Sequence, residues 1–531
     1  MTVSKEIFEY HTRSKHHLDH YAPGPRHMDW ATQPDPFRTY AGAPRIDLPL
    51  RAGSLSARFS EVRRGVRPDP APLDRDSVGT LLEISLGLSA WKSYRGTSWA
   101  LRCNPSSGNL HPTEGYVVTG AIPGLEAGVY HYVSRDHALE RRAVLADTQA
   151  LADGVLVALT SIYWREAWKY GIRAFRYCQH DCGHAIAAVA YAAAALGWRT
   201  RVLHEPGDSD VAGLLGLGRD AGSTSAEQEE PDCLLWIGST TPPSVEQLAQ
   251  LGASAEWSGW ANQLSPSHVA WRDIDAAHAA TIKGRSVDAS RFEAKGQPPA
   301  RAPLLDRPAT VIIRQRRSAV DFDGVTSITA EAFYTMLEPL VPRIGTPPWD
   351  AWPQATHVHL ALFVHRVVGL EPGLYVFARD PDAVQQLKHA MRPEWLWRKS
   401  GPRDLSLHLL IADDVRDVAR AVSCHQNIAA DSCFAVAMLA DFAVALREPW
   451  RYRALHWECG MIGQVLYLEA EAAGIRATGI GCFFDDALHQ VLGLPTGAPG
   501  EWQTLYHFTS GGAIDDPRLT TLPPYPATRG G

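Results

Sequence analysis

Phe175-Arg176, Asp181-Cys182-Gly183 and Leu196-Gly197 follow one another in the first half of this chain of 531 residues, and an Ala-rich apolar run joins the last two. The same order returns as Tyr452-Arg453, Glu458-Cys459-Gly460 and Ala473-Gly474, each at an offset of 277 residues. A repeat that keeps its punctuating glycines over this distance indicates a duplicated structural unit. We therefore predict that the chain consists of two equivalent halves.

The elements expected around this repeat have the same order in both halves. Each half is predicted to contain a helix, a β-hairpin, a strand, the long helix of the repeat and two further strands. The expected ranges are 78–88, 116–119 with 129–133, 155–160, 181–196, 199–203 and 233–237 in the first half, and 330–337, 357–364 with 374–378, 405–411, 458–473, 477–482 and 504–508 in the second. Helices mixed with hairpins and distant strands predict an α+β fold.

Composition suggests where the two halves begin and end. Residues 1–75 are rich in Pro, Arg and His, and we expect them to form an extended arm over the surface. The first half then covers residues 76–240 and the second half covers residues 309–531. Residues 241–308 contain Thr241-Pro242-Pro243 and Gln297-Pro298-Pro299-Ala300, which are typical of a linker.

Charge and hydropathy exclude several classes of partner. The net charge is −7 and the basic cluster around Arg316 is short, so no nucleic-acid partner is expected. The most apolar stretch, residues 185–196, is far shorter than a membrane span of about 20 residues. Residues 1–15 lack the apolar core of a secretory signal, and the eight cysteines include no Cys-x-x-Cys pair. We expect reduced thiols and a cytoplasmic protein without a membrane partner.

Two polar motifs are candidates for ligand binding. Arg316-Arg317-Ser318 combines two guanidinium groups and a hydroxyl, which suits a phosphate, although a solvated basic turn has the same pattern. Pro105-Ser106-Ser107-Gly108-Asn109 offers hydroxyls, an amide and backbone N–H groups to the edge of a heteroaromatic ring. Taken alone, this second motif is equally typical of an ordinary loop.

Together the two motifs resemble the nitroreductase superfamily of FMN enzymes, and the resemblance covers roughly residues 76–519. It implies that Arg316, Arg317 and Ser318 grip the phosphate and ribityl end of FMN. It also implies that Pro105, Ser106, Ser107, Gly108 and Asn109 hold the ring from the other half. Gly479-Ile480-Gly481 resembles the family loop beside the flavin ring, where glycine removes the Cβ obstruction. The implied architecture is two fused nitroreductase-like halves that form an internal pseudo-dimer with FMN between them.

The two copies of the site have diverged. The first half keeps Pro-Ser-Ser-Gly-Asn, but its counterpart of Arg-Arg-Ser reads Arg63-Arg64-Gly65. The second half keeps Arg-Arg-Ser, but its counterpart of the loop, around Thr346-Pro347-Pro348-Trp349, lacks the polar residues. Since a dimer of this family builds each site from both subunits, one complete set remains. Our hypothesis is one functional FMN per chain.

A narrower resemblance is to the azoline dehydrogenases of peptide natural-product clusters, the SagB/ThcOx type. It rests on residues 10–16 and on residues 164–184, which include Lys169-Tyr170-Gly171 and Phe175-Arg176-Tyr177. The resemblance implies that Lys169 and Tyr170 take part in removing a ring proton, which a desolvated lysine or an activated tyrosine can accept. It also implies a small-molecule or peptide substrate and biosynthetic partner enzymes. The alternative is that Lys169 is a surface residue and that Tyr170 packs in the core, with no catalytic role for either.

Other functions remain open. The family also supports NAD(P)H-dependent reduction of nitro or quinone compounds, and a protein that has lost catalysis would remain a flavin-fold binding module. His180 and His184, four residues apart with Cys178 and Cys182 nearby, resemble a zinc-binding helix, but Asp181 stands where a hydrolase needs glutamate. Because the second copy has no histidines at these positions, no metal is expected. Cys424-His425 is a weak candidate for a thiol nucleophile, and the simpler interpretation is an ordinary buried cysteine.

Overall fold

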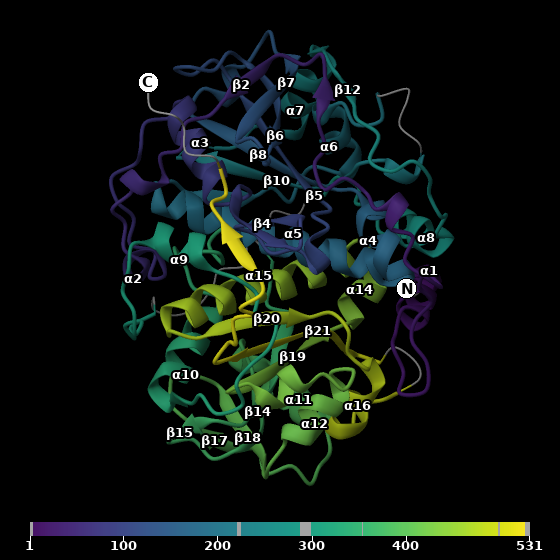
Figure 1. Ribbon diagram of the computed structural model, residues 1–531, viewed down its shortest axis with the longest axis vertical. Coiled ribbons are helices and arrows are strands. Elements are labelled where there is room, and N and C mark those ends of the chain that lie inside the picture. The colour runs from purple at the N-terminus through teal and green to yellow at the C-terminus, as the bar shows by residue number, and fades with distance from the viewer. Residues whose placement is uncertain are drawn as a thin grey trace.

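The computed structural model describes residues 4–219, 225–239, 241–286, 299–352, 354–496 and 500–525. Figure 1 shows two α+β halves stacked one above the other, the first in purple to teal and the second in green to yellow. Two long helices, α5 (Ala174–Ala195) and α15 (Arg451–Ala472), lie between the two sheets. The expected α+β class and the pseudo-dimeric arrangement of the halves are confirmed.

The first half is built on an antiparallel sheet in the order β11-β7-β6-β5-β8-β10-β9, with β2 also pairing with β7. Its strands are β2 (Arg45–Asp47), β5 (Thr113–Thr119), β6 (Gly128–Val133), β7 (Ala138–Val144), β8 (Gly154–Ser161), β9 (Thr200–Val202), β10 (Glu230–Gly238) and β11 (Glu256–Trp257). The helices α3 (Arg75–Glu83), α4 (Tyr163–Tyr170) and α6 (Asp208–Leu215) connect these strands.

The second half repeats this order as β17-β18-β16-β14-β19-β21-β20. Its strands are β14 (Val358–Val364), β16 (Gly373–Phe377), β17 (Arg398–Ser400), β18 (Leu407–Ala412), β19 (Phe434–Asp441), β20 (Arg476–Ile480) and β21 (Trp502–Gly511). The helices that accompany them include α9 (Ala309–Gln315), α10 (Ala330–Leu337), α11 (Val384–Ala390), α12 (Arg416–Val422), α14 (Ala443–Arg447) and α16 (Asp485–Leu492). Six strands of each sheet have equivalents at the same places, whereas the edge strands β11 and β17 come from different positions along the two halves.

The repeated glycines Gly183 and Gly460 mark the point where α5 and α15 cross. A Cβ on Gly183 would lie 2.2 Å from the carbonyl oxygen of Trp457, and one on Gly460 would lie 2.2 Å from that of His180. Any larger side chain would force the two backbones apart, because side-chain atoms do not fit at this separation. The two glycines that mark the repeat therefore permit the close contact between the halves.

The central strand of the second half differs from the prediction. The sequence predicts residues 405–411 as the counterpart of 155–160, but β18 pairs at the position of β7, and the counterpart of β8 is β19. Phe434 and Val436 face one apolar core and Ala435 and Ala437 face another. A strand buried on both faces has a continuous apolar sequence, which does not distinguish it from a buried helix.

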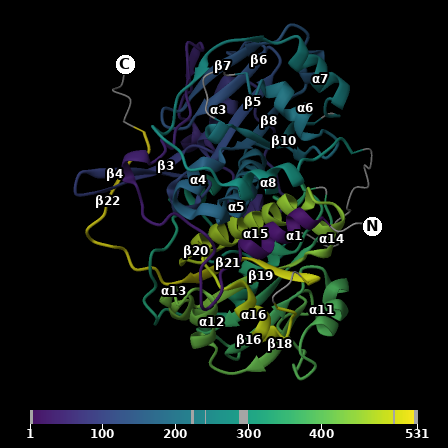
Figure 2. The same ribbon diagram turned by 90° about the vertical axis from the view of Figure 1, so that its right-hand side faces the viewer.

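The amino-terminal region is less extended than expected. It contains the nine-residue helix α1 (Lys5–Arg13), whose buried face consists of Ile7, Tyr10 and His11. Tyrosine and histidine carry polar groups, so a hydropathy pattern does not reveal this face. Figure 2 shows α1 beside α14 and α15, at the junction of the two halves.

The predicted linker also contains regular structure. Residues 241–308 include α7 (Val245–Ala253), which packs on α6, and α8 (Arg272–Ala280), which packs on α1. Leu248 and Leu251 on α7 and Ile274 on α8 are buried. The sequence predicts a linker here because these helices are short and the prolines around them are typical of loops. Residues 287–298, with part of the Gln297-Pro298-Pro299-Ala300 motif, lie outside the described residues.

A small sheet that the sequence did not predict connects the halves a second time. β3 (Leu88–Tyr94) pairs with β4 (Thr97–Arg102) and also with β22 (Thr520–Leu522), which follows the last strand of the second half. The carboxy-terminal tail therefore crosses onto the first half (Figure 2). Among the described helices, none has the length and apolar character needed to cross a membrane.

Candidate active site between the halves

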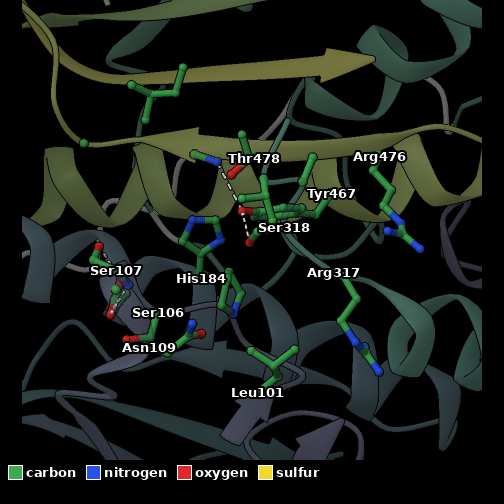
Figure 3. Close-up of a pocket in the computed structure, with 18 of the residues that line it drawn as sticks. Leu101, Ser106, Ser107, Asn109, His184, Arg317, Ser318, Tyr467, Arg476 and Thr478 are labelled. Atoms are coloured by element: carbon green, nitrogen blue, oxygen red, sulfur yellow. Dashed lines mark hydrogen bonds between the residues drawn. The ribbon is translucent and has the colours of Figure 1, made fainter. Parts of the chain in front are cut away.

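A cavity of about 510 Å³ lies between the two halves and has walls from both. Eleven residues of the three predicted cofactor motifs line it: Pro105, Ser106, Ser107, Gly108, Asn109, Arg316, Arg317, Ser318, Gly479, Ile480 and Gly481. Figure 3 shows Ser106, Ser107 and Asn109 on one side of the cavity, and Arg317 and Arg476 on the other. The volume lies within the range of typical small-molecule sites, about 300–1,000 Å³. The fold thus brings together residues more than 370 positions apart in sequence.

The loop that carries Ser106 and Ser107 is held by the first long helix. The backbone N–H of Ser107 donates to both carboxylate oxygens of Asp181 at 3.2 Å, and its hydroxyl donates to one of them at 3.2 Å. The Ser106 hydroxyl accepts the N–H of His111 at 2.8 Å. Gly108 and Asn109 adopt positive φ angles of 61° and 57°. Side-chain acceptors and left-handed residues therefore shape the loop that faces the cavity.

Lys169 and Tyr170 lie directly behind this loop, at the end of α4. A Cβ on Gly108 would lie 2.6 Å from the Tyr170 hydroxyl and 3.0 Å from Lys169 Nζ. Tyr170 lines the cavity, and its ring lies 5.2 Å from Lys169 Nζ. The structure therefore places both predicted catalytic residues beside the Ser-Ser-Gly-Asn loop, and Lys169 is only partly exposed.

The opposite end of the cavity is strongly cationic. Lys92, Arg102, Arg316, Arg317 and Arg476 line the cavity, with Asp515 and Asp516 as acidic neighbours, of which Asp515 pairs with Arg476. Arg316 donates to the carbonyl oxygens of Cys103 at 3.2 Å and Arg102 at 2.9 Å, but its Nη1 atom is buried without a hydrogen-bond partner. Burial, followed by the charge of Arg316, lowers the pKa of Arg317 to about 10. A buried guanidinium at Arg316, with an unpaired Nη1 atom and the partly exposed guanidinium of Arg317 beside it, suits a polyanionic ligand.

The roof of the cavity comes from the second half. Ser318 and Tyr467 are joined by a hydroxyl–hydroxyl hydrogen bond of 2.7 Å, and the N–H of Gly479 donates to Tyr467 at 3.1 Å (Figure 3). A Cβ on Gly479 would lie 1.9 Å from the Tyr506 hydroxyl. The sequence predicts that the missing Cβ of Gly479 lets the backbone approach the cofactor closely. In the structure, the need for glycine follows already from the packing of Tyr506.

Two buried carboxyl groups at the site were not predicted. Asp181 lines the cavity, and burial raises its pKa to about 7, although hydrogen bonds from Ser106 and Ser107 oppose this effect. Glu166, one turn before Lys169, is buried with neither carboxyl oxygen hydrogen-bonded. Burial, and then Asp181, raise the pKa of Glu166 well above its ordinary value. The sequence repeat contains a signal for Asp181, because both copies have a carboxylate at this position of the long helix. Its equivalent, Glu458, accepts the backbone N–H of His357 at 3.1 Å.

The amino-terminal helix reaches the site through a buried ionic cluster. Asp485 accepts from Arg173 at 3.0 Å and from Arg176 at 2.9 Å, and Lys15 Nζ lies 2.7 Å from Asp486. Burial alone would raise the pKa of Asp485, but the two arginines hold it below its ordinary range. Residues 10–16 and the segment around Arg176 carry the narrower sequence resemblance, and Asp485 and Asp486 follow the Gly479-Ile480-Gly481 motif closely in sequence. They therefore meet at one place beside the cavity.

The pseudo-symmetric counterpart of the cavity is filled. Arg63, the counterpart of Arg316, is buried in an ion pair with Glu469 at 2.8 Å. Trp352 of the degenerate loop is 7% exposed and lines this region together with Trp450 and Trp457. Trp349 of the same loop is buried against the guanidinium of Arg379. Val202 and His204 are the counterparts of Gly479 and Gly481, and the cavity that they line measures about 30 Å³, room for about one water molecule.

The zinc alternative finds no support in the side-chain arrangement. His180 stacks on Tyr506 with ring centroids 4.1 Å apart, and His184 lies 3.3 Å from the Gln464 side-chain oxygen. Within the described ranges, no three His, Cys, Asp or Glu side chains are grouped as metal ligands. Cys178 and Cys182 are buried in the apolar core.

Comparison with known proteins gives a consistent picture. The sequence model of the nitroreductase family matches residues 239–512, more than half of the chain. The trifolitoxin-processing protein TfxB of Rhizobium leguminosarum bv. trifolii is 31% identical over 195 residues, which cover 32% of this chain and 52% of that protein. A protein of Methanocaldococcus jannaschii that carries a nitroreductase name is 32% identical over 166 residues, which cover 29% of this chain and 80% of that protein.

The similarity of fold extends further than the sequence match. A crystal structure of a nitroreductase-like protein from Anabaena variabilis superposes with a TM-score of 0.68 at 21% identity, covering 97% of this chain and 100% of that one. It therefore includes the first half, which the family sequence model leaves out. The chain spans only about half the length of the rhizobial relative.

Proposed function

Since this chain belongs to the nitroreductase family of oxidoreductases, we propose that it binds one FMN between its halves and dehydrogenates an azoline ring in a peptide-derived substrate. The observation that carries the proposal is the polarity of the cavity. It has a cationic end around Arg316 and Arg317, and a polar loop backed by Lys169 and Tyr170 at the other end.

The residues of the cavity fit FMN. A dianionic phosphate satisfies the unpaired Nη1 atom of Arg316 and offsets the repulsion between Arg316 and Arg317. The Ser318 hydroxyl, on the same segment, suits the ribityl chain, and the loop from Ser106 to Asn109 offers donors and acceptors to the polar edge of the ring. FMN supplies a two-electron acceptor when bound.

Proton removal is assigned to Lys169. Burial, and then Glu166, raise the pKa of Tyr170 well above its ordinary value, so the Tyr170 hydroxyl keeps its proton. Tyr170 therefore orients the substrate as a hydrogen-bond donor, and Lys169 Nζ accepts the ring proton. The sequence left these two roles undivided between the lysine and the tyrosine.

The class of substrate rests on the resemblance to azoline dehydrogenases and on the relative named for processing trifolitoxin. We also propose that biosynthetic partner enzymes form the azoline ring before this chain acts. The alternative, reduction of nitro or quinone compounds with NAD(P)H, is supported by the relative with a nitroreductase name.

We expect one FMN per chain, because the counterpart cavity of about 30 Å³ cannot hold a flavin. The measurement is the visible absorption spectrum of the purified chain, with quantification of the flavin released on denaturation. Reconstitution with excess FMN should not raise the ratio. Two FMN per folded chain would contradict the filled second site, and a chain that takes up none would favour the binding-module alternative.

Incubation of the FMN-loaded chain with a thiazoline-containing peptide should yield the thiazole, with a loss of two hydrogen atoms that mass spectrometry detects. The same peptide carrying the saturated thiazolidine ring tests whether the imine of the ring is needed. Turnover of nitro compounds with NADPH, combined with no change in the thiazoline peptide, would replace the proposed reaction with the reductase alternative.

A further inference from the structure

Two cysteines from separate segments meet at the wall of the cavity. Cys424 follows α12 and Cys482 follows β20, 58 positions later in the sequence. Their sulfur atoms lie 2.7 Å apart, and Cys482 lines the cavity. Both side chains are partly exposed, whereas the other six cysteines of the chain are buried. The accessible thiols are therefore the two that contact each other.

The backbone holds this contact in place. Cys424 and His425 both adopt left-handed conformations, with φ angles of 52° and 59°, which residues other than glycine rarely do. The next residue, Gln426, donates from Nε2 to the carbonyl oxygens of Ser423 and Cys482, each at 2.9 Å. Uncommon backbone conformations persist where the surrounding structure requires them, and they often occur at functional positions.

The charges around the pair favour one thiol as the nucleophile. The hydrogen bond with the Cys424 thiol lowers the pKa of Cys482; burial opposes this effect and the guanidinium of Arg173 reinforces it. Arg173 also donates to the carbonyl oxygen of Gly481 at 2.8 Å, which fixes it beside Cys482. Asp485 is the nearby acidic group and opposes Arg173. A cation and a thiol donor are the features that activate cysteines for exchange.

We propose that Cys424 and Cys482 form a reversible disulfide at the cavity wall by exchange with a low-molecular-weight disulfide such as glutathione disulfide. The bond joins the segment after α12 to the loop after β20, so it fixes the position of Gln426 against the backbone of Cys482 at the wall of the site. This modification site is independent of the identity of the cofactor and of the substrate.

The exchange balances in two steps. The Cys482 thiolate attacks one sulfur of glutathione disulfide, which forms a mixed disulfide and releases one glutathione thiolate that takes up a proton. The Cys424 thiol loses its proton and attacks the Cys482 sulfur, which forms the protein disulfide and releases the second glutathione. Two protein thiols are oxidised and one glutathione disulfide is reduced to two glutathione molecules.

The test uses the purified full-length chain, incubated with glutathione disulfide, alkylated with iodoacetamide and digested without reductant. We expect a peptide pair linked through Cys424 and Cys482, the loss of both reactive thiols and of two hydrogen atoms in mass, and full reversal by dithiothreitol. The buried cysteines serve as an internal control, since they should be alkylated only after unfolding.

Two single variants test the order of the steps. Cys424→Ser should accumulate a stable glutathione adduct on Cys482, because the second thiol is missing. Cys482→Ser should accumulate far less adduct on Cys424 in the same time. A wild-type chain that keeps both thiols free, or carries glutathione on each without a linked peptide, would overturn the proposal. Adduct formation mainly on Cys424 in Cys482→Ser would overturn the assigned order.

Discussion

Replacement of Lys169 by alanine should lower the rate of azoline dehydrogenation by about 10²- to 10⁴-fold, the usual contribution of a positioned general base. Lys169 Nζ lies beside Gly108 and the Tyr170 hydroxyl, at the end of the cavity that faces away from the arginines. FMN content should stay unchanged, because Lys169 belongs to none of the three motifs proposed to hold the cofactor. The measurements are single-turnover kinetics of the thiazoline peptide and the flavin spectrum of the variant.

Three further variants make this result specific. Lys169→Met keeps the length of the side chain without the amine, and should be as slow as Lys169→Ala. Tyr170→Phe keeps the ring that packs on Tyr177 and should have a smaller effect, because the tyrosine hydroxyl remains protonated. Lys388→Ala changes an exposed lysine on α11 and should leave the rate unchanged. If Lys169→Ala oxidises the peptide as fast as the wild type, Lys169 is not the base.

Replacement of Arg317 by alanine should weaken FMN binding by about 10- to 150-fold, which corresponds to the loss of about 1.5–3 kcal/mol from a charged hydrogen bond. Riboflavin, which lacks the phosphate, should bind the variant and the wild type with similar affinity. Arg317 is anchored through the carbonyl oxygens of Arg314 at 2.8 Å and Ser89 at 2.9 Å, so its guanidinium is held at the cationic end of the cavity. Titration by flavin fluorescence measures both affinities.

The matched control is Arg314→Ala. Arg314 belongs to the same basic cluster but lies on α9, outside the cavity wall, with Glu83 at 3.6 Å. Its removal should leave both flavin affinities unchanged. Equal losses of FMN and riboflavin affinity in Arg317→Ala would show that the substitution distorts the cavity and that Arg317 does not bind the phosphate. Unchanged FMN affinity would place the phosphate elsewhere.

The duplicated α+β fold could be predicted from sequence because its signals are local. Gly183 and Gly460 recur at one offset since each long helix needs a glycine where the two cross, and the predicted strands alternate or run apolar over short stretches. The cofactor motifs could be predicted because each is a contiguous run of characteristic residues, although their joint meaning came from a family resemblance. Strand β19 was missed, because burial on both faces removes the alternation that identifies a strand.

Other features depend on contacts between residues that are far apart in the chain. Asp181 and Ser107, Arg63 and Glu469, and Cys424 and Cys482 are separated by tens to hundreds of positions. No local pattern encodes these pairs, because only the folding of each half, and for Arg63 and Glu469 the packing of the two halves, brings the partners together. The residue types in the chain thus specify the two halves and the donor groups. Tertiary packing decides that one cavity stays open and cationic while tryptophans fill its counterpart, because burial and charge neutralisation depend on which side chains the fold brings together.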